Sequence, residues 1–152
     1  MIDIERDDPA REDVRQLLNE HLADLFATSP ADSVHALDHS ALSGPDITLW
    51  TAREAGGLLG CGALKQLAAQ QGEIKSMRTT PAALLLTRIV DEARRRHYEH
   101  LYLETGSEEF FAPARRLYHR HGFTHCLPFA GYTLDPHSVF MHLPLAGGTP
   151  AP

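Results

Sequence analysis

The chain has 152 residues, a formal net charge of −6 and a mean hydropathy of −0.26. This length fits one domain that can bury a hydrophobic core without disulfides or metals. Acidic residues are spread along the chain and the only basic run is Arg94 to Arg96, so we expect no nucleic-acid partner. We also expect no membrane contact, because no apolar stretch approaches the ~20 residues of a membrane-spanning helix.

The cysteines and the first residues indicate the compartment. Cys61 and Cys126 are too few for a disulfide framework, and we interpret both as small buried hydrophobes in a reducing environment. Residues 1–9 are charged rather than apolar, so we expect no signal peptide and a cytoplasmic protein.

Hydrophobic periodicity predicts alternating strands and helices along the chain. Ile2 and Ile4 alternate with acidic residues, as in a strand, and Pro9 begins a segment whose apolar residues repeat at helical spacing. In chain order, the predicted elements are a strand at 2–5, helices at 9–27 and 34–42, a hairpin of strands at 47–53 and 58–67, a strand at 73–79, a helix at 84–97, a strand at 101–104, a helix at 113–121, and strands at 123–129 and 138–145.

This order mixes hairpins with helical crossovers, which indicates a single α/β or α+β domain over residues 1–145 around one mixed sheet. We expect the Gly- and Pro-rich tail at 146–152 to be disordered. Pro113 and Gly122 bound the last predicted helix, which carries Tyr118 near its middle. On local evidence alone, Tyr118 is a core residue of an ordinary strand–helix unit.

Three segments change that interpretation: GEIKSMRTTPA at 72–82, LLLTRIVDEARRRHYEHLYLETG at 84–106 and PARRLYHRHGF at 113–123. In this order and spacing they resemble the GNAT superfamily of acetyl-CoA-dependent N-acetyltransferases. Within it, the chain looks similar to a bacterial group of small, mostly uncharacterised acetyltransferases that share the LETGS, FxPARxLY, GF, PF and DPxSVFM segments. The resemblance covers residues 2–145 and implies a GNAT-like acyl-CoA N-acyltransferase fold, with a mixed, mostly antiparallel sheet of about seven strands and helices on both faces.

The resemblance also implies an activity: transfer of an acetyl group from acetyl-CoA to the amine of a small molecule or amino acid, by direct attack in a ternary complex. An amine with a pKa near 10.4 must first lose a proton, which costs about 4.6 kcal/mol at pH 7, and the departing thiolate benefits from an acid. We expect Tyr118 to be the acid. Glu73 is the expected base, directly or through water; the alternative is a solvated carboxylate at a strand edge. Since dimers are common among relatives, a homodimer is a further expectation.

Further site residues follow from the same resemblance. Two strands should splay apart, and the pantetheine arm of the cofactor then pairs with their free backbone groups. The expected cofactor-binding residues are Met77, Arg78, Thr79, Ala83, Leu84, Thr105 and Ser107. The expected acceptor-binding residues are His35, Asp38, Glu104 (also a second candidate base) and Tyr132, with Asp135 as a further polar candidate. The ten histidines show no ligand spacing, so we predict no metal site.

One departure from the family pattern concerns the phosphate-binding loop. Members usually carry an Arg/Gln-x-x-Gly-x-Gly/Ala loop whose backbone N–H groups hold the pyrophosphate of coenzyme A. Here TTPA leads directly into ALLLTRIV near Ala83, without that loop. Either the chain lacks the loop, which would weaken cofactor binding, or residues of a mobile loop are missing from the sequence. An intact mass of 16.8 kDa would exclude the second explanation.

Two other functional classes stay open. A degenerate member could bind or sense acyl-CoA without transferring the acyl group. A structural subunit could instead pair with a partner through an exposed edge strand at 138–145. Stabilisation by acetyl-CoA would argue against the structural subunit, and release of free thiol across a panel of amines would separate an enzyme from a sensor.

Overall fold

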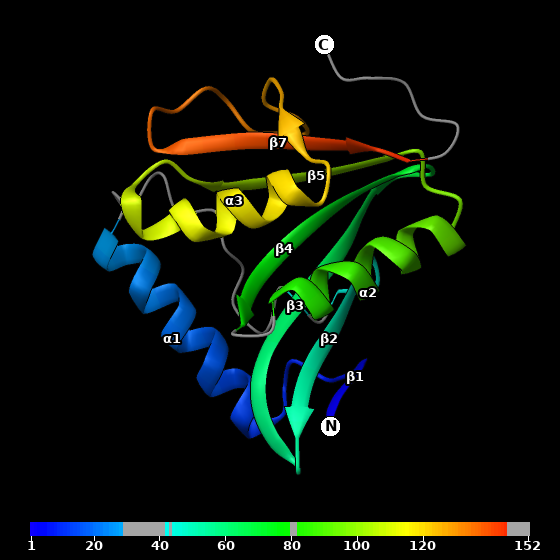
Figure 1. Ribbon diagram of the computed structural model, residues 1–152, viewed down its shortest axis with the longest axis vertical. Helices are drawn as coiled ribbons and strands as arrows, with labels where there is room; N and C mark the ends of the chain where they lie inside the picture. Colours follow the sequence, from blue (N-terminus) through cyan, green and yellow to red (C-terminus); the bar gives the residue numbers. More distant parts are fainter. Residues whose placement is uncertain (29–41, 43, 80–81, 146–152) are drawn as a thin grey trace.

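A computed structural model describes residues 1–28, 42, 44–79 and 82–145 (Figure 1). The predicted helix at 34–42 and the predicted tail therefore lie outside the described residues, apart from Leu42, which is buried. The acceptor candidates His35 and Asp38 also lie outside them.

The described strands and helices follow the predicted order. They are β1 (Ile2–Arg6), α1 (Glu12–Thr28), β2 (Ile47–Glu54), β3 (Gly57–Ala68), β4 (Gln71–Thr79), α2 (Ala82–Arg95), β5 (His100–Gly106), a 3-10 turn η3 (Glu109–Phe111), α3 (Ala112–Arg120), β6 (Thr124–His125) and β7 (Ser138–Pro144). The helix α1 begins later than predicted, because Asp8 accepts the Ala10 N–H at 2.8 Å and holds the residues after it in a turn.

The strands form one seven-stranded sheet in the order β1-β2-β3-β4-β5-β7-β6 (Figure 1). Every neighbouring pair is antiparallel except β4 and β5, which run parallel because the helix α2 connects them. The prediction of one mixed, mostly antiparallel sheet is therefore confirmed.

Alternate residues of the strands face opposite sides of this sheet, and a hydrophobic cluster covers each side. On one side, Trp50, Leu64 and Ile74 pack against residues of α2 and α3 such as Ile89 and Leu117. On the other side, Leu49, Cys61 and Ala63 pack against Val14 and Leu18 of α1. Helices on both faces of the sheet were expected, and this expectation is confirmed.

The hairpin of β2 and β3 closes with a two-residue turn at Ala55 and Gly56. Both residues have positive φ, 51° and 82° respectively. Paired positive φ values are typical of a type I′ turn, which matches the twist of an antiparallel hairpin and favours glycine. This turn explains why the predicted hairpin is confirmed in position and pairing.

The end of the chain departs from prediction. The predicted strand at 123–129 is wrong in extent, since only Thr124 and His125 pair with β7. The N–H of Phe123 instead donates to the carbonyl of Tyr118 at the end of α3, and Pro128 has no N–H to donate. The strand β7 lies between β5 and β6, but β6 pairs only with Met141 and His142, so the edge-pairing role considered for residues 138–145 stays a prediction.

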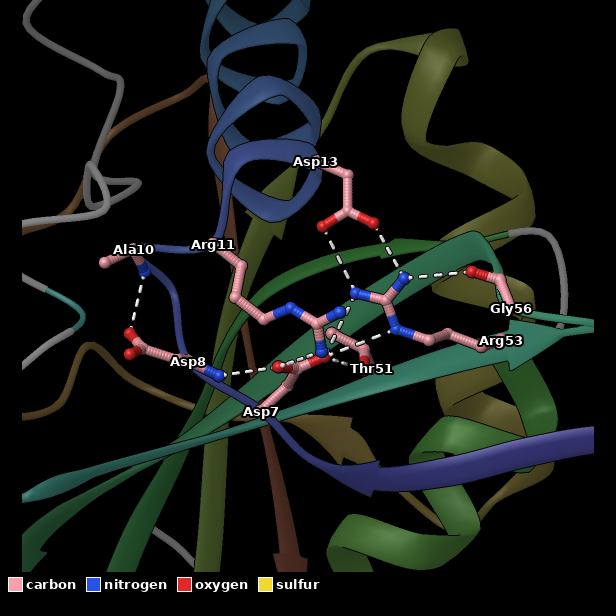
Figure 2. Close-up of polar contacts among 8 residues, drawn as sticks. All are labelled: Asp7, Asp8, Ala10, Arg11, Asp13, Thr51, Arg53 and Gly56. Carbon is pink, nitrogen blue, oxygen red and sulfur yellow. Dashed lines mark hydrogen bonds and ion pairs between the residues drawn. The ribbon is translucent and has the colours of Figure 1, made fainter.

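A partly buried ion-pair network fixes the start of α1 to the hairpin (Figure 2). The guanidinium of Arg53, on β2, donates to Asp7 at 3.2 Å and to Asp13 of α1 at 2.7 Å. Burial alone would raise the pKa of Asp7, but hydrogen bonds from Thr51, from the Asp8 backbone and from two arginines lower it overall. The network therefore holds an ionised carboxylate where β1 ends and α1 begins.

A second network explains the basic run at the end of α2. Glu92, whose side chain is 6% exposed, accepts hydrogen bonds from Arg95 at 3.3 Å and from Arg96 at 2.9 Å, and Arg6 of β1 donates to it at 3.2 Å. These arginines serve the packing of α2 on the sheet.

Candidate active site

The strands β4 and β5 start side by side and then move apart (Figure 1). Their register pairs Gln71 with His100 and ends where Ile74 lies opposite Leu103. Beyond this point, among the described strands, residues 75–79 pair only with β3 and residues 104–106 only with β7. The backbone N–H and C=O groups on the two facing edges have no strand partner, and such groups need one. We call this region the β4–β5 divergence; the expected splay is confirmed.

A buried polar cluster lies where the divergence begins. Glu73 and Lys75 project from the same face of β4, since alternate strand residues share a face. Tyr132 Oη donates to Glu73 Oε2 at 2.6 Å, and Lys75 Nζ donates to the same oxygen at 3.1 Å and to Tyr132 Oη at 2.8 Å. The Glu73 and Lys75 side chains are 4% and 8% exposed. The alternative of a solvated edge carboxylate is therefore wrong, because Glu73 is buried and ion-paired on an interior strand.

An aromatic layer holds Tyr132 in this position. Phe129 lies 4.9 Å from Tyr102 of β5 and 5.1 Å from Tyr132, measured between ring centroids. Tyr132 also lies 5.6 Å from the ring of Phe140 on β7. These contacts fasten the loop of residues 127–137 to the sheet face that bears Glu73.

The charge of Glu104 acts on both Tyr118 and Tyr132. Tyr118, 5% exposed, packs edge-on against Phe123 at 5.9 Å between ring centroids, which confirms the local interpretation of a packing residue. Burial raises the pKa of Tyr118 to about 12, and the negative charge of Glu104 adds to this. Burial, followed by the charges of Glu73 and Glu104, also raises the pKa of Tyr132. Both phenols therefore keep their protons at neutral pH and can donate them.

The expected cofactor residues of β4 border the divergence with their backbone. Met77 and Arg78 lie on its unpaired stretch, and Thr79 ends the strand. The Met77 side chain packs next to Gly62, and the Arg78 guanidinium forms an ion pair with Asp24 of α1. These side chains are engaged elsewhere, so the backbone groups are the ones available at the divergence.

The remaining cofactor candidates lie at its rim. Ala83 and Leu84 are exposed in the first turn of α2, whose N–H groups lack intrahelical partners and which carries no acidic residue. Thr105 pairs with Val139 of β7. Ser107 Oγ donates to the carbonyl of Pro136 at 2.7 Å, so this hydroxyl contacts the 127–137 loop.

Sequence reasoning missed Lys75, the residue that joins Glu73 to Tyr132. Its spacing of two residues from Glu73 on a predicted strand was a usable signal, because it places both side chains on one face. Asp135 has a local role, since its carboxylate accepts the His137 N–H at 2.8 Å.

Among the described residues, no three His, Cys, Asp or Glu side chains are grouped so that they could hold a metal ion. No helix in the described ranges is long and apolar enough to cross a bilayer. Burial raises the pKa of the Cys61 thiol to about 12, as suits a packing residue. Cys126 is only partly buried, so the expectation of a buried thiol is wrong there.

Comparisons with known proteins bear on this geometry. The model of the acetyltransferase (GNAT) family matches residues 12–123. The uncharacterised N-acetyltransferase YsnE of Bacillus subtilis (strain 168) is 50% identical over 145 residues, covering 91% of this chain and 96% of the relative. The IAA acetyltransferase of Azospirillum brasilense is 39% identical over 155 residues, covering 95% of this chain and 98% of the relative.

A further relative bears on the missing loop. The uncharacterised N-acetyltransferase YedL of Escherichia coli (strain K12) is 41% identical over 159 residues, covering 100% of both chains. Since this chain has only 152 residues, YedL carries residues that have no counterpart here.

Solved structures share the fold. A Klebsiella pneumoniae protein assigned as an acyl-CoA N-acyltransferase superposes with a TM-score of 0.76 at 28% identity, covering 95% of this chain and 98% of that one. An Elizabethkingia anophelis GNAT family acetyltransferase with acetyl-CoA bound superposes with a TM-score of 0.63 at 16% identity, covering 95% and 98%.

Proposed function

Because the chain belongs to the GNAT family of acetyltransferases, we propose that it transfers the acetyl group of acetyl-CoA to the amine of a small molecule or amino acid. The observation that carries this proposal is the β4–β5 divergence, with Glu73 and Tyr132 at its start and Glu104 at its β5 edge. The acetyl-CoA bound to the Elizabethkingia protein and the acetyltransferase name of the Azospirillum relative support the donor and the reaction.

The residues present fit the cofactor in its pantetheine part. Unpaired backbone groups on β4, at Met77, Arg78 and Thr79, would accept it as an added strand. The free N–H groups of Ala83 and Leu84 would face its phosphates, with Thr105 and Ser107 at the far rim. When bound, acetyl-CoA supplies the thioester that breaks as the new amide bond forms.

The chain's own residues supply the proton transfers. Glu73 would accept, directly or through water, the proton that the acceptor nitrogen loses. Tyr118, which stays protonated at neutral pH, would hold a proton at Oη for the leaving thiol. Counted from the neutral amine, the nitrogen loses one proton and the sulfur gains one, so the two transfers balance; the additional proton of an ammonium acceptor leaves to solvent before the attack.

The charge around the divergence supports an amine acceptor. The carboxylate of Glu104 raises the pKa of Tyr118 and of Tyr132, so its negative field reaches both sides of the site. A field that opposes ionisation of a phenol favours a cationic ammonium by the same electrostatics. We include Glu104 and Tyr132, together with His35 and Asp38, in the acceptor site.

The second candidate function is an acyl-CoA-binding or sensing domain without transfer. A genuine absence of the phosphate-binding loop would favour it, and here only residues 80 and 81 separate β4 from α2. A thermal-shift titration with acetyl-CoA tests cofactor binding, because a ligand that binds the folded state raises its stability with concentration. Binding without release of free thiol from any amine would favour this second function.

Glu73→Gln tests the base directly. We expect the rate of thiol release to fall by at least about 100-fold and the acidic limb of the pH–rate profile to disappear, since the titrating base is gone. A variant that keeps both the wild-type rate and the acidic limb would remove Glu73 from this role.

We also propose a cytoplasmic protein whose partners are small molecules rather than nucleic acid or membranes. A homodimer is part of the same proposal, and light scattering at two protein concentrations would test it.

A further inference from the structure

Two buried charged side chains and a half-buried phenol form a closed triangle at the start of the divergence. Lys75 Nζ donates to both Glu73 Oε2 and Tyr132 Oη, and Tyr132 Oη donates to the same Glu73 oxygen, with all three distances between 2.6 and 3.1 Å. The three directions of donation are mutually compatible, because the phenol oxygen accepts from the ammonium while its proton goes to the carboxylate.

The triangle engages only one oxygen of the carboxylate. Within the described part of the chain, Glu73 Oε2 receives both hydrogen bonds and Oε1 receives none. A carboxylate oxygen has lone pairs that seek donors when water is excluded. The arrangement therefore fixes the orientation of Glu73 and leaves one oxygen for another donor.

Lys75 also provides the opposite charge beside Glu73, at 3.1 Å. A carboxylate that is 4% exposed pays heavily for ionisation unless a cation lies close to it. Other titratable groups face Glu73: Lys65 lies opposite it on β3, Tyr102 lies beside it on β5, and Tyr132 approaches from the loop. Among the described residues, Lys75 is the only cation within ion-pair distance.

We propose that Lys75 is a positioning residue for acetyl transfer: as the buried cation beside Glu73 and together with Tyr132, it holds the carboxylate so that Oε1 faces the acceptor amine. This proposal rests on the proposed function and assigns a role that the sequence did not suggest. Lys75 acts through Glu73 rather than on the transferred proton, since its Nζ donates to Glu73 and to Tyr132.

The test compares Lys75→Met with two related variants. Lys75→Met should lower the rate at pH 7 by about 10-fold or more and move the acidic limb of the pH–rate profile upward by about one pH unit, because a buried carboxylate without its cation ionises at higher pH. Lys75→Arg keeps the positive charge and should restore the pH at which the acidic limb lies, although the larger planar guanidinium will fit less well. The matched control is Lys65→Met, which should leave the rate within about 2-fold because Lys65 lies on the same face without contacting Glu73.

A double-mutant cycle distinguishes a loss of action through Glu73 from a folding defect. If Lys75 acts through Glu73, adding Lys75→Met to Glu73→Gln should change the rate by less than about 3-fold, and this pair leaves no uncompensated charge buried. Additive losses, or a Lys75→Met variant with an unmoved acidic limb, would overturn the proposal while leaving the acetyl-transfer function intact. A wild-type protein that releases no thiol would overturn both.

Discussion

Tyr118 is a buried phenol and Tyr132 a half-buried one, and they differ in what their hydroxyl groups contact. Tyr132 donates to Glu73 at 2.6 Å, whereas the Tyr118 hydroxyl makes no hydrogen bond with any described residue. A protonated donor without a protein partner can serve a reacting group, while a donor already bound to a carboxylate serves mainly to orient it. This difference supports Tyr118 as the acid and Tyr132 as a support for the base.

Tyr118→Phe separates chemistry from packing. The ring remains, so the free energy of unfolding should change by less than about 1 kcal/mol, while the chemical rate should fall by about 100-fold. Single-turnover kinetics with acetyl-CoA would measure the rate, and urea unfolding the stability. Tyr98→Phe is the matched control, because Tyr98 is 4% exposed in the same hydrophobic cluster and should leave the rate unchanged. Unchanged turnover in Tyr118→Phe would return Tyr118 to packing alone.

Among single residues, the sequence could identify those that belong to a local motif. Tyr118 and Glu73 stand in segments whose order resembles the family, so both could be proposed as site residues. The contact of Lys75 with Tyr132 joins residues 57 positions apart, and no local pattern predicts such a pairing. Only the folded sheet and the aromatic layer bring the loop to β4.

Among the elements, the junction of β5 with η3 and α3 leaves no room for an added side chain at Gly106. Gly106 ends β5, and the ring of Phe111 lies against it so closely that a Cβ would overlap the ring carbons. The same junction sets where α3, and with it Tyr118, sits relative to the sheet.

Gly106→Ala should therefore destabilise the protein by about 1–3 kcal/mol, because Phe111 must move to admit the methyl group. The matched control is Gly131→Ala, where a Cβ would meet nothing within 4 Å and the effect should stay below about 0.5 kcal/mol. Urea unfolding of both variants would measure the difference. Equal stabilities would show that the ring moves aside without cost.

Element prediction succeeded where a local signal marks the boundary. The turn at Ala55 and Gly56 and the helix end at Gly122, whose φ is 96°, are both readable as glycine positions. It failed for β6, because residues 126–129 have strand-like composition, yet Phe129 packs against the rings of Tyr102 and Phe140 and is not part of a strand. It also misplaced the start of α1, where the Asp8 side chain competes with the helix for a backbone donor.

Over the whole molecule, the helix α1 connects the sheet face that it covers with the β4–β5 divergence. Its residue His21 lies against Arg78 of β4 and near Asp24. Burial and the charge of Arg78 lower the pKa of His21 to about 4, with Asp24 acting weakly in the opposite direction. Burial and the neighbouring His100 also lower the pKa of His142 on β7.

These shifts predict how stability depends on pH. Unfolded histidines bind protons below about pH 6.5, whereas folded His21 stays neutral until about pH 4, so stability is full above pH 6.5 and falls as pH decreases through this window. His21→Leu should reduce that fall by about 1–3 kcal/mol, leaving the contribution of His142. Urea unfolding at pH 7.5 and pH 4.5 would measure it. The same substitution at exposed His119 should keep the wild-type dependence of stability on pH. If His21→Leu also keeps that dependence, His21 is not held neutral by burial.

The most direct measurement is mass spectrometry of the amine after incubation of the full-length protein with acetyl-CoA and a panel of small amines and amino acids. We predict at least one acetylated product that forms in proportion to released thiol, and that Glu73→Gln slows by about 100-fold. Stabilisation of the protein by acetyl-CoA with no acetylated amine anywhere in the panel would contradict the transferase and favour an acyl-CoA-binding domain.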